Sequence, residues 1–191
     1  MLFNSETTLI KRGTLDLYLK ELAKEFKRLN GSKAHAEIVL IGGGAVLANY
    51  NFRESSGDID GLINANASLK MAINTVGDRH KLRNFWLNDD FMKTDSYSDK
   101  LFEVSARYKD FNKVLMVRTV SGEYLIAMKL MSGRQYKYDF SDVIGILMEH
   151  QISNNPITRD KIDNAISYLY SDPIPEHSII QKIRQKNTDG L

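Results

Sequence analysis

The stretch "LIGGGAVLANYNFRESSGDIDGLI", residues 40–63, sets three glycines after an apolar run and two aspartates inside a second apolar run. Side chains alternate along a strand, so Asp58 and Asp60 would share one face while Ile59 points to the other. Two carboxylates on one face of a half-buried strand repel each other and lose hydration, and a nearby cation relieves both costs. Mg²⁺ suits such a pair because it takes oxygen ligands and combines one or two carboxylates with substrate phosphates. The simpler alternative is that the aspartates cap turns or pair with Arg53.

The three glycines before the aspartates suggest a phosphate-binding turn. Small residues after a strand let backbone N–H groups point at an anion, and the N-terminus of a following helix adds its positive dipole. Gly42, Gly43 and Gly44 are therefore candidates for a phosphate cradle. The dinucleotide-binding fingerprint is not met, because Leu47 stands at its third glycine position, and no Gly-Lys-Ser/Thr completes a P-loop. A cradle followed by a carboxylate pair indicates a site for phosphates and the metal that bridges them.

The composition restricts the class of protein. The chain has 191 residues, with 26 Lys and Arg against 24 Asp and Glu, so net charge alone does not indicate nucleic-acid or membrane binding. Cysteine is absent, which excludes disulfides, thiol catalysis and cysteine metal sites. The first residues lack the apolar core of a signal peptide, and no apolar run approaches the roughly 18 residues of a membrane span. We expect a cytoplasmic protein without a membrane partner.

Hydrophobic periodicity predicts helices and strands on both sides of the motif. Leu15, Leu19, Leu22 and Phe26 define the clearest helical stripe, which Thr14 could cap. We expect helices over residues 14–31, 45–52, 68–82, 122–134, 140–151, 157–171 and 174–187, and strands over residues 36–44 (ending in the glycine turn), 57–64, 101–108 and 113–120. This order of elements predicts an α/β (α+β) fold with a mixed sheet, flanking helices and a helical C-terminal part.

Residues 83–101 show no period and mix aromatic residues with Asn, Asp and Ser. A loop of this length inside a compact domain is often functional. Trp86, Phe85 and Phe91 would either pack this loop onto the domain or stack against a nucleobase, and the sequence leaves both roles open.

Three separated segments carry a resemblance to a known group of enzymes. Residues 41–63 resemble the nucleotidyltransferase superfamily typified by DNA polymerase beta, whose signature is a Gly-Gly or Gly-Ser turn, a spacer and Asp-hydrophobic-Asp. The "GGGA…R…S.DID" form is similar to the bacterial AbiEii-type toxin nucleotidyltransferases and to a neighbouring uncharacterised family. "FWLNDDFMKTDSYS" (85–98) resembles a segment of that uncharacterised family, and "YLIAMKLMSGRQYKYDFSDVIGIL" (124–147) resembles a helix pair shared by both.

The resemblance implies a division of the chain into three parts. Residues 1–35 would form an N-terminal helix packed on the core, residues 36–150 the nucleotidyltransferase core, and residues 151–191 a C-terminal helical segment.

The resemblance also implies roles for the residues of the opening motif. Asp58 and Asp60 would be catalytic ligands of Mg²⁺ or Mn²⁺. Gly42, Gly43 and Gly44 would pack against the triphosphate of an NTP.

Further charged residues match the family pattern. Arg53 would contact phosphate or brace the aspartates. Lys129 would contact the phosphates or the nucleotide; the alternative is a lysine whose aliphatic stem lies along an apolar helix while its ammonium group reaches solvent. Asp139 and Asp142 match an acidic pair of the next helix, where they would cap the helix or pair with Arg134.

A third carboxylate is the point at which the sequence departs from the family. Active members usually place another acid on an adjacent strand. Glu103, inside the strand expected over residues 101–108, is the first candidate for this catalytic role, because Asp95, Asp110 and Glu123 fall at turns. Without a third acid, metal and nucleotide binding would survive while turnover falls.

The resemblance implies transfer of a nucleoside monophosphate from an NTP to a hydroxyl of a protein or an RNA such as tRNA. A toxin–antitoxin role with an antitoxin-like partner would follow from the same likeness. Two alternatives remain: a catalytically inactive nucleotide- or partner-binding module of the same fold, and an Asp-x-Asp glycosyltransferase. The glycine turn and the short chain argue against the glycosyltransferase.

Overall fold

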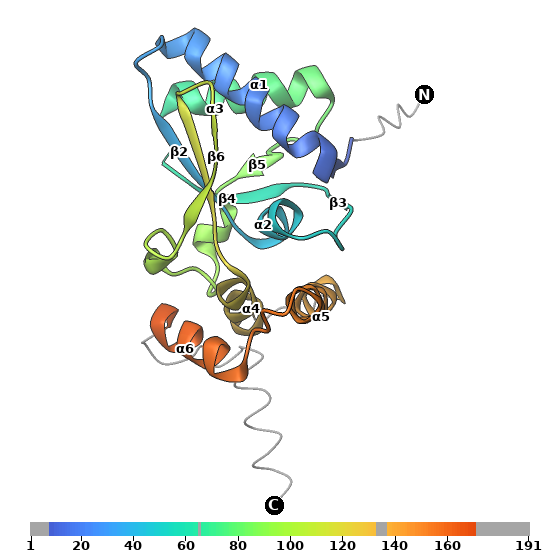
Figure 1. Cartoon of the computed structure of the whole chain (residues 1–191). Helices are drawn as coiled ribbons and strands as arrows, with labels where there is room; N and C mark the ends of the chain where they lie inside the picture. Colours follow the sequence, from blue (N-terminus) through green and yellow to red (C-terminus); the bar gives the residue numbers. More distant parts are fainter. Residues whose placement is uncertain (1–7, 65, 133–136, 171–191) are drawn as a thin grey trace, which may run out of the picture.

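A five-stranded mixed sheet organises the protein, whose computed structural model describes residues 8–64, 66–132 and 137–170 (Figure 1). The sheet has the order β5-β4-β2-β7-β6 and consists of β2 (Ala36–Leu40), β4 (Ile59–Ile63), β5 (Leu87–Asn88), β6 (Ala106–Phe111) and β7 (Leu115–Thr119). Strands β2 and β7 are parallel, as are β4 and β5, whereas β2 pairs with β4 and β6 with β7 in antiparallel fashion. A separate ribbon pairs β1 (Ile10–Lys11) with β3 (Ser55–Ser56). The predicted α/β fold with a mixed sheet is confirmed.

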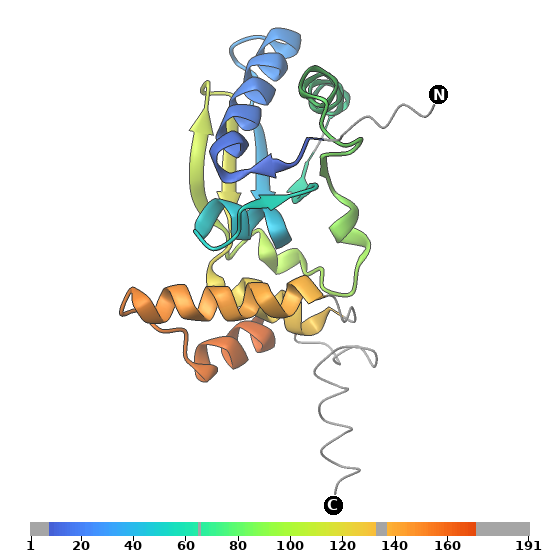
Figure 2. The same cartoon turned by 90° about the vertical axis from the view of Figure 1, so that its right-hand side faces the viewer.

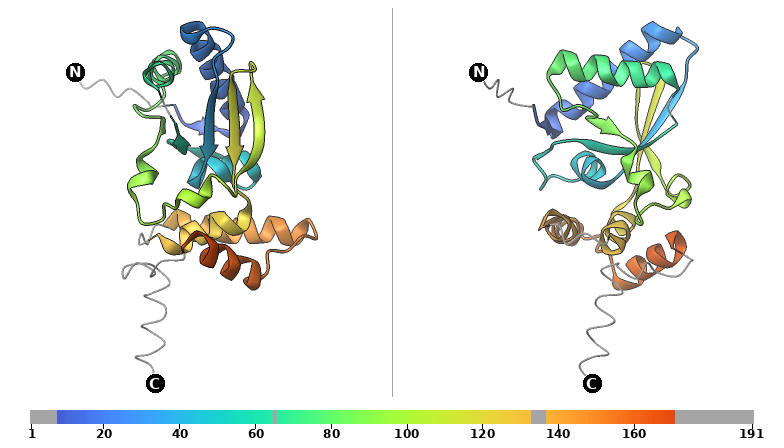
Figure 3. Two further views of the ribbon diagram at one scale, coloured as in Figure 1. Left: turned by 90° about the vertical axis from the view of Figure 1, so that its left-hand side faces the viewer. Right: turned by 180° about the vertical axis from the view of Figure 1, so that it is seen from behind.

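Six helices surround this sheet in the described part of the chain. They are α1 (Arg12–Asn30), α2 (Gly42–Asn49), α3 (Ala67–His80), α4 (Gly122–Met131), α5 (Lys137–Ile152) and α6 (Arg159–Leu169). Figures 2 and 3 show α1 lying along one face of the sheet and α4, α5 and α6 gathered beyond one end of the strands. Strands β2 and β7 both lead into this end, since α2 follows β2 and α4 follows β7. None of these described helices is long and apolar enough to cross a membrane.

The apolar stripe of α1 explains why this segment is helical and where it packs. Leu15, Leu19, Leu22 and Phe26 are all at most 1% exposed. The helix begins at Arg12, before the expected position, so Thr14 lies inside its first turn, where its Oγ1 accepts the N–H of Lys11 (3.0 Å). The predicted helix is therefore confirmed, with its start moved. The helix expected over residues 174–187 lies outside the described residues.

The strand expected over residues 101–108 is wrong for its first five residues. Residues 99–101 form the short 3-10 helix η2 (Asp99–Leu101), and residues 102–104 are turns, so that β6 begins only at Ala106. Local hydrogen bonds hold this turn, such as that from Val104 N to Lys100 O (3.2 Å). The apolar residues of this segment suit a turn as well as a strand, because their spacing does not distinguish the two.

The aromatic-rich segment of residues 83–101 contains β5, the 3-10 helix η1 (Asp90–Lys93) and η2. Trp86 is 1% exposed and its Nε1–H donates to the carbonyl of Ile73 (2.9 Å). Of the two roles left open for these aromatic residues, Trp86 therefore has the packing role. Phe85 beside it is 72% exposed.

A glycine substitution tests how tightly the helical end of the molecule packs. A Cβ at Gly122 would lie 2.5 Å from Tyr50 Oη, 2.6 Å from Ile157 Cδ1 and 2.9 Å from Ile146 Cγ2. We expect Gly122→Ala to lower the free energy of unfolding by about 1–3 kcal/mol, because all three neighbours must shift. Urea denaturation measures the effect. Gly13→Ala, where a Cβ meets nothing within 4 Å, is the matched control and should not destabilise.

Candidate functional site

The three glycines form the first turn of α2, whereas the sequence led us to expect a helix beginning after them. The first intrahelical hydrogen bond runs from Ala45 N to Ile41 O (3.1 Å). Gly42 has φ +52°, a left-handed conformation that favours glycine. The first N–H groups of a helix have no intrahelical acceptor and carry the positive end of its dipole. The glycines themselves therefore present the anion-binding end of α2.

Asp60 lies directly beside this helix start. Strands β2 and β4 pair with Leu40 opposite Gly61, and Ile41 N donates to the carbonyl of Asp60 (3.0 Å). A Cβ on Gly42 would lie only 3.3 Å from Asp60 Oδ2. Sheet pairing therefore places a carboxylate next to the glycines, as the motif predicts.

Asp58 precedes β4 and does not lie within it. Ile59 is fully buried, whereas Asp58 and Asp60 are both partly exposed, which agrees with alternation along the chain. The side chain of Asp58 is 44% exposed, and its Oδ2 lies 3.6 Å from Nη1 of Arg83. Asp58 is thus on the exposed side of the chain together with Asp60, and its charge is shared with a cation from the turn after α3.

A small cavity connects the glycines and Asp60 to α4. Its volume is about 130 Å³, and it is lined by Gly42, Gly43, Asp60, Phe91, Thr94, Ser96, Leu125, Met128, Lys129, Ser132 and Asp139. The structure therefore brings the glycines, Asp60 and Lys129 together from three distant segments. We refer to this cavity as the cleft.

The sequence did not identify Thr94 and Ser96 of the aromatic-rich segment as cleft residues, whereas Phe91 was already a candidate for packing or for stacking against a nucleobase. The length and aperiodic composition of that segment were the available signal. Tyr170, directly after α6, donates its hydroxyl to the carbonyl of Ser96 (2.6 Å). Burial raises the pKa of the Tyr170 phenol, so the hydroxyl keeps its proton and remains a donor at neutral pH. The C-terminal helix thereby supports one wall of the cleft.

Four charged side chains form a network at the back of the cleft. Asp142 Oδ2 accepts from Arg53 Nη1 (2.6 Å) and lies 2.8 Å from Lys129 Nζ, which also donates to Asp139 Oδ1 (2.8 Å). Asp142 is 3% exposed, and a buried carboxylate at this depth requires such partners. Arg53 is therefore held by Asp142 on α5. The other expected partner of this acidic pair, Arg134, lies outside the described residues.

Arg53 also contacts the glycine turn. A Cβ at Gly43 would lie 2.9 Å from Arg53 Nη2, so this position accommodates little more than glycine. The network thus links α5, α4 and the first turn of α2 through Arg53, Asp142 and Lys129.

Glu103 does not lie where the sequence analysis placed it. It belongs to the turn before β6, and its Oε2 accepts the hydroxyl hydrogen of Tyr168 on α6 (2.7 Å). On the strand adjacent to the motif, the residue paired with Asp60 is Asn88. An amide therefore stands opposite Asp60 on β5, one of the two strands beside β4.

The donor set fits a metal ion that is bound together with a nucleotide. Within the described ranges, no group of three or more His, Asp or Glu side chains could hold a metal. Asp60 offers a carboxylate next to the N-terminus of α2, and Asp58 precedes it on the same exposed side of the chain. Mg²⁺ is commonly held by one or two carboxylates plus substrate phosphates. These two residues are the ones that would hold such an ion.

A substitution at Gly42 tests the phosphate-binding end of α2. Gly42→Ala places a side chain in a left-handed conformation and puts its Cβ 3.3 Å from the Asp60 carboxylate. We expect a free energy of unfolding lower by about 1–2 kcal/mol and a metal-dependent NTP affinity lower by about fivefold or more. Calorimetric titration with NTP and Mg²⁺ measures the affinity. Gly57→Ala, which meets nothing within 4 Å, should change neither quantity, and equal effects of both substitutions would contradict a special role for Gly42.

Nucleotidyltransferase-like proteins are among the known proteins that resemble this chain. A family model described as "Nucleotidyltransferase of unknown function (DUF6036)" matches residues 18–172. Among solved structures, the chain is similar to an antigenic nucleotidyltransferase-like protein from Paracoccidioides brasiliensis, with 14% sequence identity and a TM-score of 0.45. That match covers 86% of this chain and 100% of the other. A search of curated proteins found no match.

Proposed function

The chain belongs to the family of nucleotidyltransferases of unknown function, and from this premise we propose that it transfers a nucleoside monophosphate from an NTP to a hydroxyl acceptor. The likeness to the nucleotidyltransferase superfamily inferred from the opening motif is confirmed by the family match. The reaction, its metal dependence and its acceptor are our proposal.

One observation carries this proposal above the others. The first turn of α2, the carboxylate of Asp60 and the ammonium group of Lys129 line one cleft, although they come from three separate segments. A helix N-terminus and a lysine both favour phosphate, and a carboxylate favours the cation that accompanies a triphosphate. The cleft therefore combines the groups that a magnesium nucleotide would need.

The residues of the cleft, together with Asp58, have distinct tasks in the proposed reaction. Backbone N–H groups of Gly42 and Gly43 would bind phosphate oxygens, while Asp58 and Asp60 would hold Mg²⁺ or Mn²⁺. The bound metal ion would neutralise the charge that develops on the transferred phosphoryl group. Lys129 would exchange part of its ion pairing with Asp139 for a phosphate oxygen. In phosphoryl transfer the protein mainly positions groups and neutralises charge, and these residues would contribute to both tasks.

The experiment that tests the proposal is a label-transfer assay. The full chain is incubated with each α-³²P-labelled NTP, Mg²⁺ or Mn²⁺, and either cell lysate or tRNA. We expect label on a protein or an RNA and none when Asp58→Ala and Asp60→Ala are combined. Transfer that persists in this double variant would refute the proposed site. The family resemblance also suggests an antitoxin-like partner. If a small gene lies beside the gene of this protein, its product is added to the same assay to test it as that partner.

A second candidate function has its own supporting observation. Asn88, and no acid, pairs with Asp60 on the neighbouring strand, and Lys129 is bound by two carboxylates. These features favour a nucleotide-binding module that does not turn over. Metal-dependent NTP binding without label transfer to lysate or tRNA would support the module over the enzyme.

A further inference from the structure

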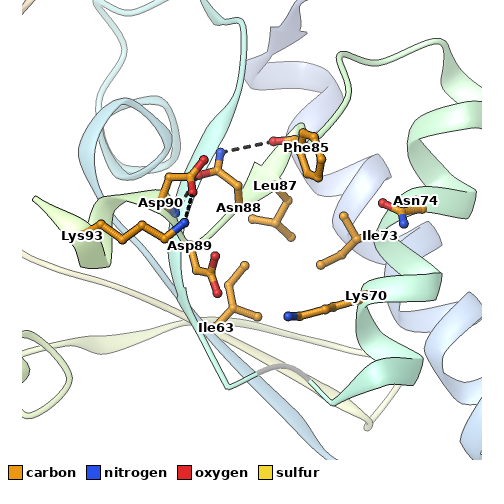
Figure 4. A pocket seen from close by; sticks show the side chains of 10 residues that line it. All are labelled: Ile63, Lys70, Ile73, Asn74, Phe85, Leu87, Asn88, Asp89, Asp90 and Lys93. Carbon is orange, nitrogen blue, oxygen red and sulfur yellow. Dashed lines mark hydrogen bonds and ion pairs between the residues drawn. The ribbon is translucent and has the colours of Figure 1, made fainter.

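A second cavity, larger than the cleft, lies between α3 and residues 85–93 (Figure 4). Its volume is about 410 Å³, which falls within the range of small-molecule sites. Ile63, Ile73 and Leu87 give it an apolar surface, and each comes from a different element, namely β4, α3 and β5. Because these elements belong to the folded core, the apolar surface is formed before any ligand arrives.

Phe85 forms an aromatic wall of this cavity. Its side chain is 72% exposed, and its backbone has φ +60°, which is rare for a bulky residue. Asn88 Nδ2 donates to the Phe85 carbonyl (3.2 Å), and the following Trp86 is buried, so the residues after Phe85 hold its backbone while its ring lies at the surface. Phe85 also lines a third cavity, of about 300 Å³, whose lining includes Arg83. An exposed ring beside an apolar surface suits a flat ligand that stacks on it.

The polar groups of the cavity select the kind of flat ligand. Lys70 and Asn74 lie one turn apart on α3 and point into the cavity, and Asp89 points into it from the opposite wall (Figure 4). An asparagine amide both donates and accepts hydrogen bonds, as the edge of a nucleobase does. A carboxylate accepts from an exocyclic amino group, and a lysine ammonium group binds phosphate.

We propose that this cavity is a second nucleotide site, separate from the cleft, which binds a nucleoside monophosphate whose base carries an exocyclic amino group. The base stacks on Phe85 above the apolar surface, its amino group donates to Asp89, and its phosphate lies near Lys70. An aliphatic ligand would offer no hydrogen-bond donor to the Asp89 carboxylate, whereas an exocyclic amino group would, so the cavity favours the base that carries one. The site adjoins the cleft through Asn88, which lines the cavity and pairs with Asp60.

Equilibrium titration of the full chain with AMP, GMP, CMP and UMP tests the proposal. The measurements are made in EDTA, so that metal-dependent binding in the cleft does not contribute. We expect CMP to bind about tenfold more tightly than UMP, which has no amino group, and Asp89→Asn to remove this difference. We expect Phe85→Ala to weaken CMP binding about fivefold or more through the loss of stacking. Phe140→Ala, which removes a 69% exposed phenylalanine on α5, is the matched control and should have no effect.

Two results would overturn the proposal. CMP affinity that is the same in Phe85→Ala as in Phe140→Ala would show that the ring does not contact the ligand. CMP affinity lost in Asp60→Asn but retained in Phe85→Ala would place the nucleotide in the cleft. Because none of these measurements uses label transfer, the second site can stand or fall independently of the proposed catalytic activity.

Discussion

Replacing Asp60 with asparagine is expected to reduce nucleotide transfer by at least about a hundredfold, because the variant loses a carboxylate ligand of the metal ion that would neutralise the negative charge on the phosphoryl group. Asp60 is the carboxylate that lines the cleft beside the glycine turn, with its Oδ2 3.3 Å from the Cβ position of Gly42. Asparagine keeps the size of the side chain and removes its negative charge. Initial rates of label transfer at saturating NTP measure the effect.

Two comparisons make this prediction specific. Circular dichroism and urea unfolding of Asp60→Asn should match the parent chain, since the side chain is partly exposed. Asp163→Asn, on an exposed pair of α6, is the matched carboxylate control and should leave transfer unchanged. If Asp60→Asn retained more than a tenth of the parent rate, Asp60 would not be a ligand of a catalytic metal.

Replacing Asp142 with alanine is expected to lower the free energy of unfolding by about 3–5 kcal/mol. One oxygen of this side chain, Oδ2, lies 2.6 Å from Arg53 Nη1 and 2.8 Å from Lys129 Nζ. The side chain of Asp142 is 5% exposed, that of Arg53 18% and that of Lys129 9%. Removal of the shared carboxylate leaves the Arg53 guanidinium without this partner and leaves Lys129, among the described residues, with the carboxylate of Asp139. The large loss of stability arises because the buried cations would remain desolvated without the carboxylate that balanced their charge. Urea denaturation of the full chain measures it.

An exposed ion pair gives the matched control for Asp142. Arg159 and Asp163 lie 3.4 Å apart on α6, with side chains 91% and 59% exposed, so Asp163→Ala should cost less than about 1 kcal/mol. If Asp142→Ala is too unstable to purify, Asp142→Asn keeps the shape and retains an acceptor, and we expect a smaller loss of stability. Equal stability of Asp142→Ala and Asp163→Ala would mean that the buried network contributes nothing to the fold.

The local pattern around the motif determined a large part of the site. Side chains alternate between the two faces at Asp58, Ile59 and Asp60, and this alternation can be recognised from three consecutive residues. Strand β2, the glycines and β4 follow each other closely in the chain, so their pairing costs little loop-closure entropy. For this reason the neighbourhood of Asp60 and Gly42 could be predicted before any tertiary structure was known.

Glu103 shows where local pattern was insufficient. Its segment has the apolar content of a strand, but hydrogen bonds between near neighbours hold it as a turn. Its side chain then meets Tyr168, a partner 65 residues further along the chain. Spacing of apolar residues gives no information about such a distant partner.

The sequence by itself determined the mixed α/β fold class and the presence of a carboxylate motif beside the glycines, because each follows from residues that are close in the chain. Only the tertiary structure decided that Asp142 would hold both Arg53 and Lys129, and that Asn88 would stand beside Asp60. These pairings join residues far apart in sequence, and they depend on strand register and helix packing that the whole core sets together. A buried charge needs a partner, but which partner it finds is decided by the packing of the complete chain.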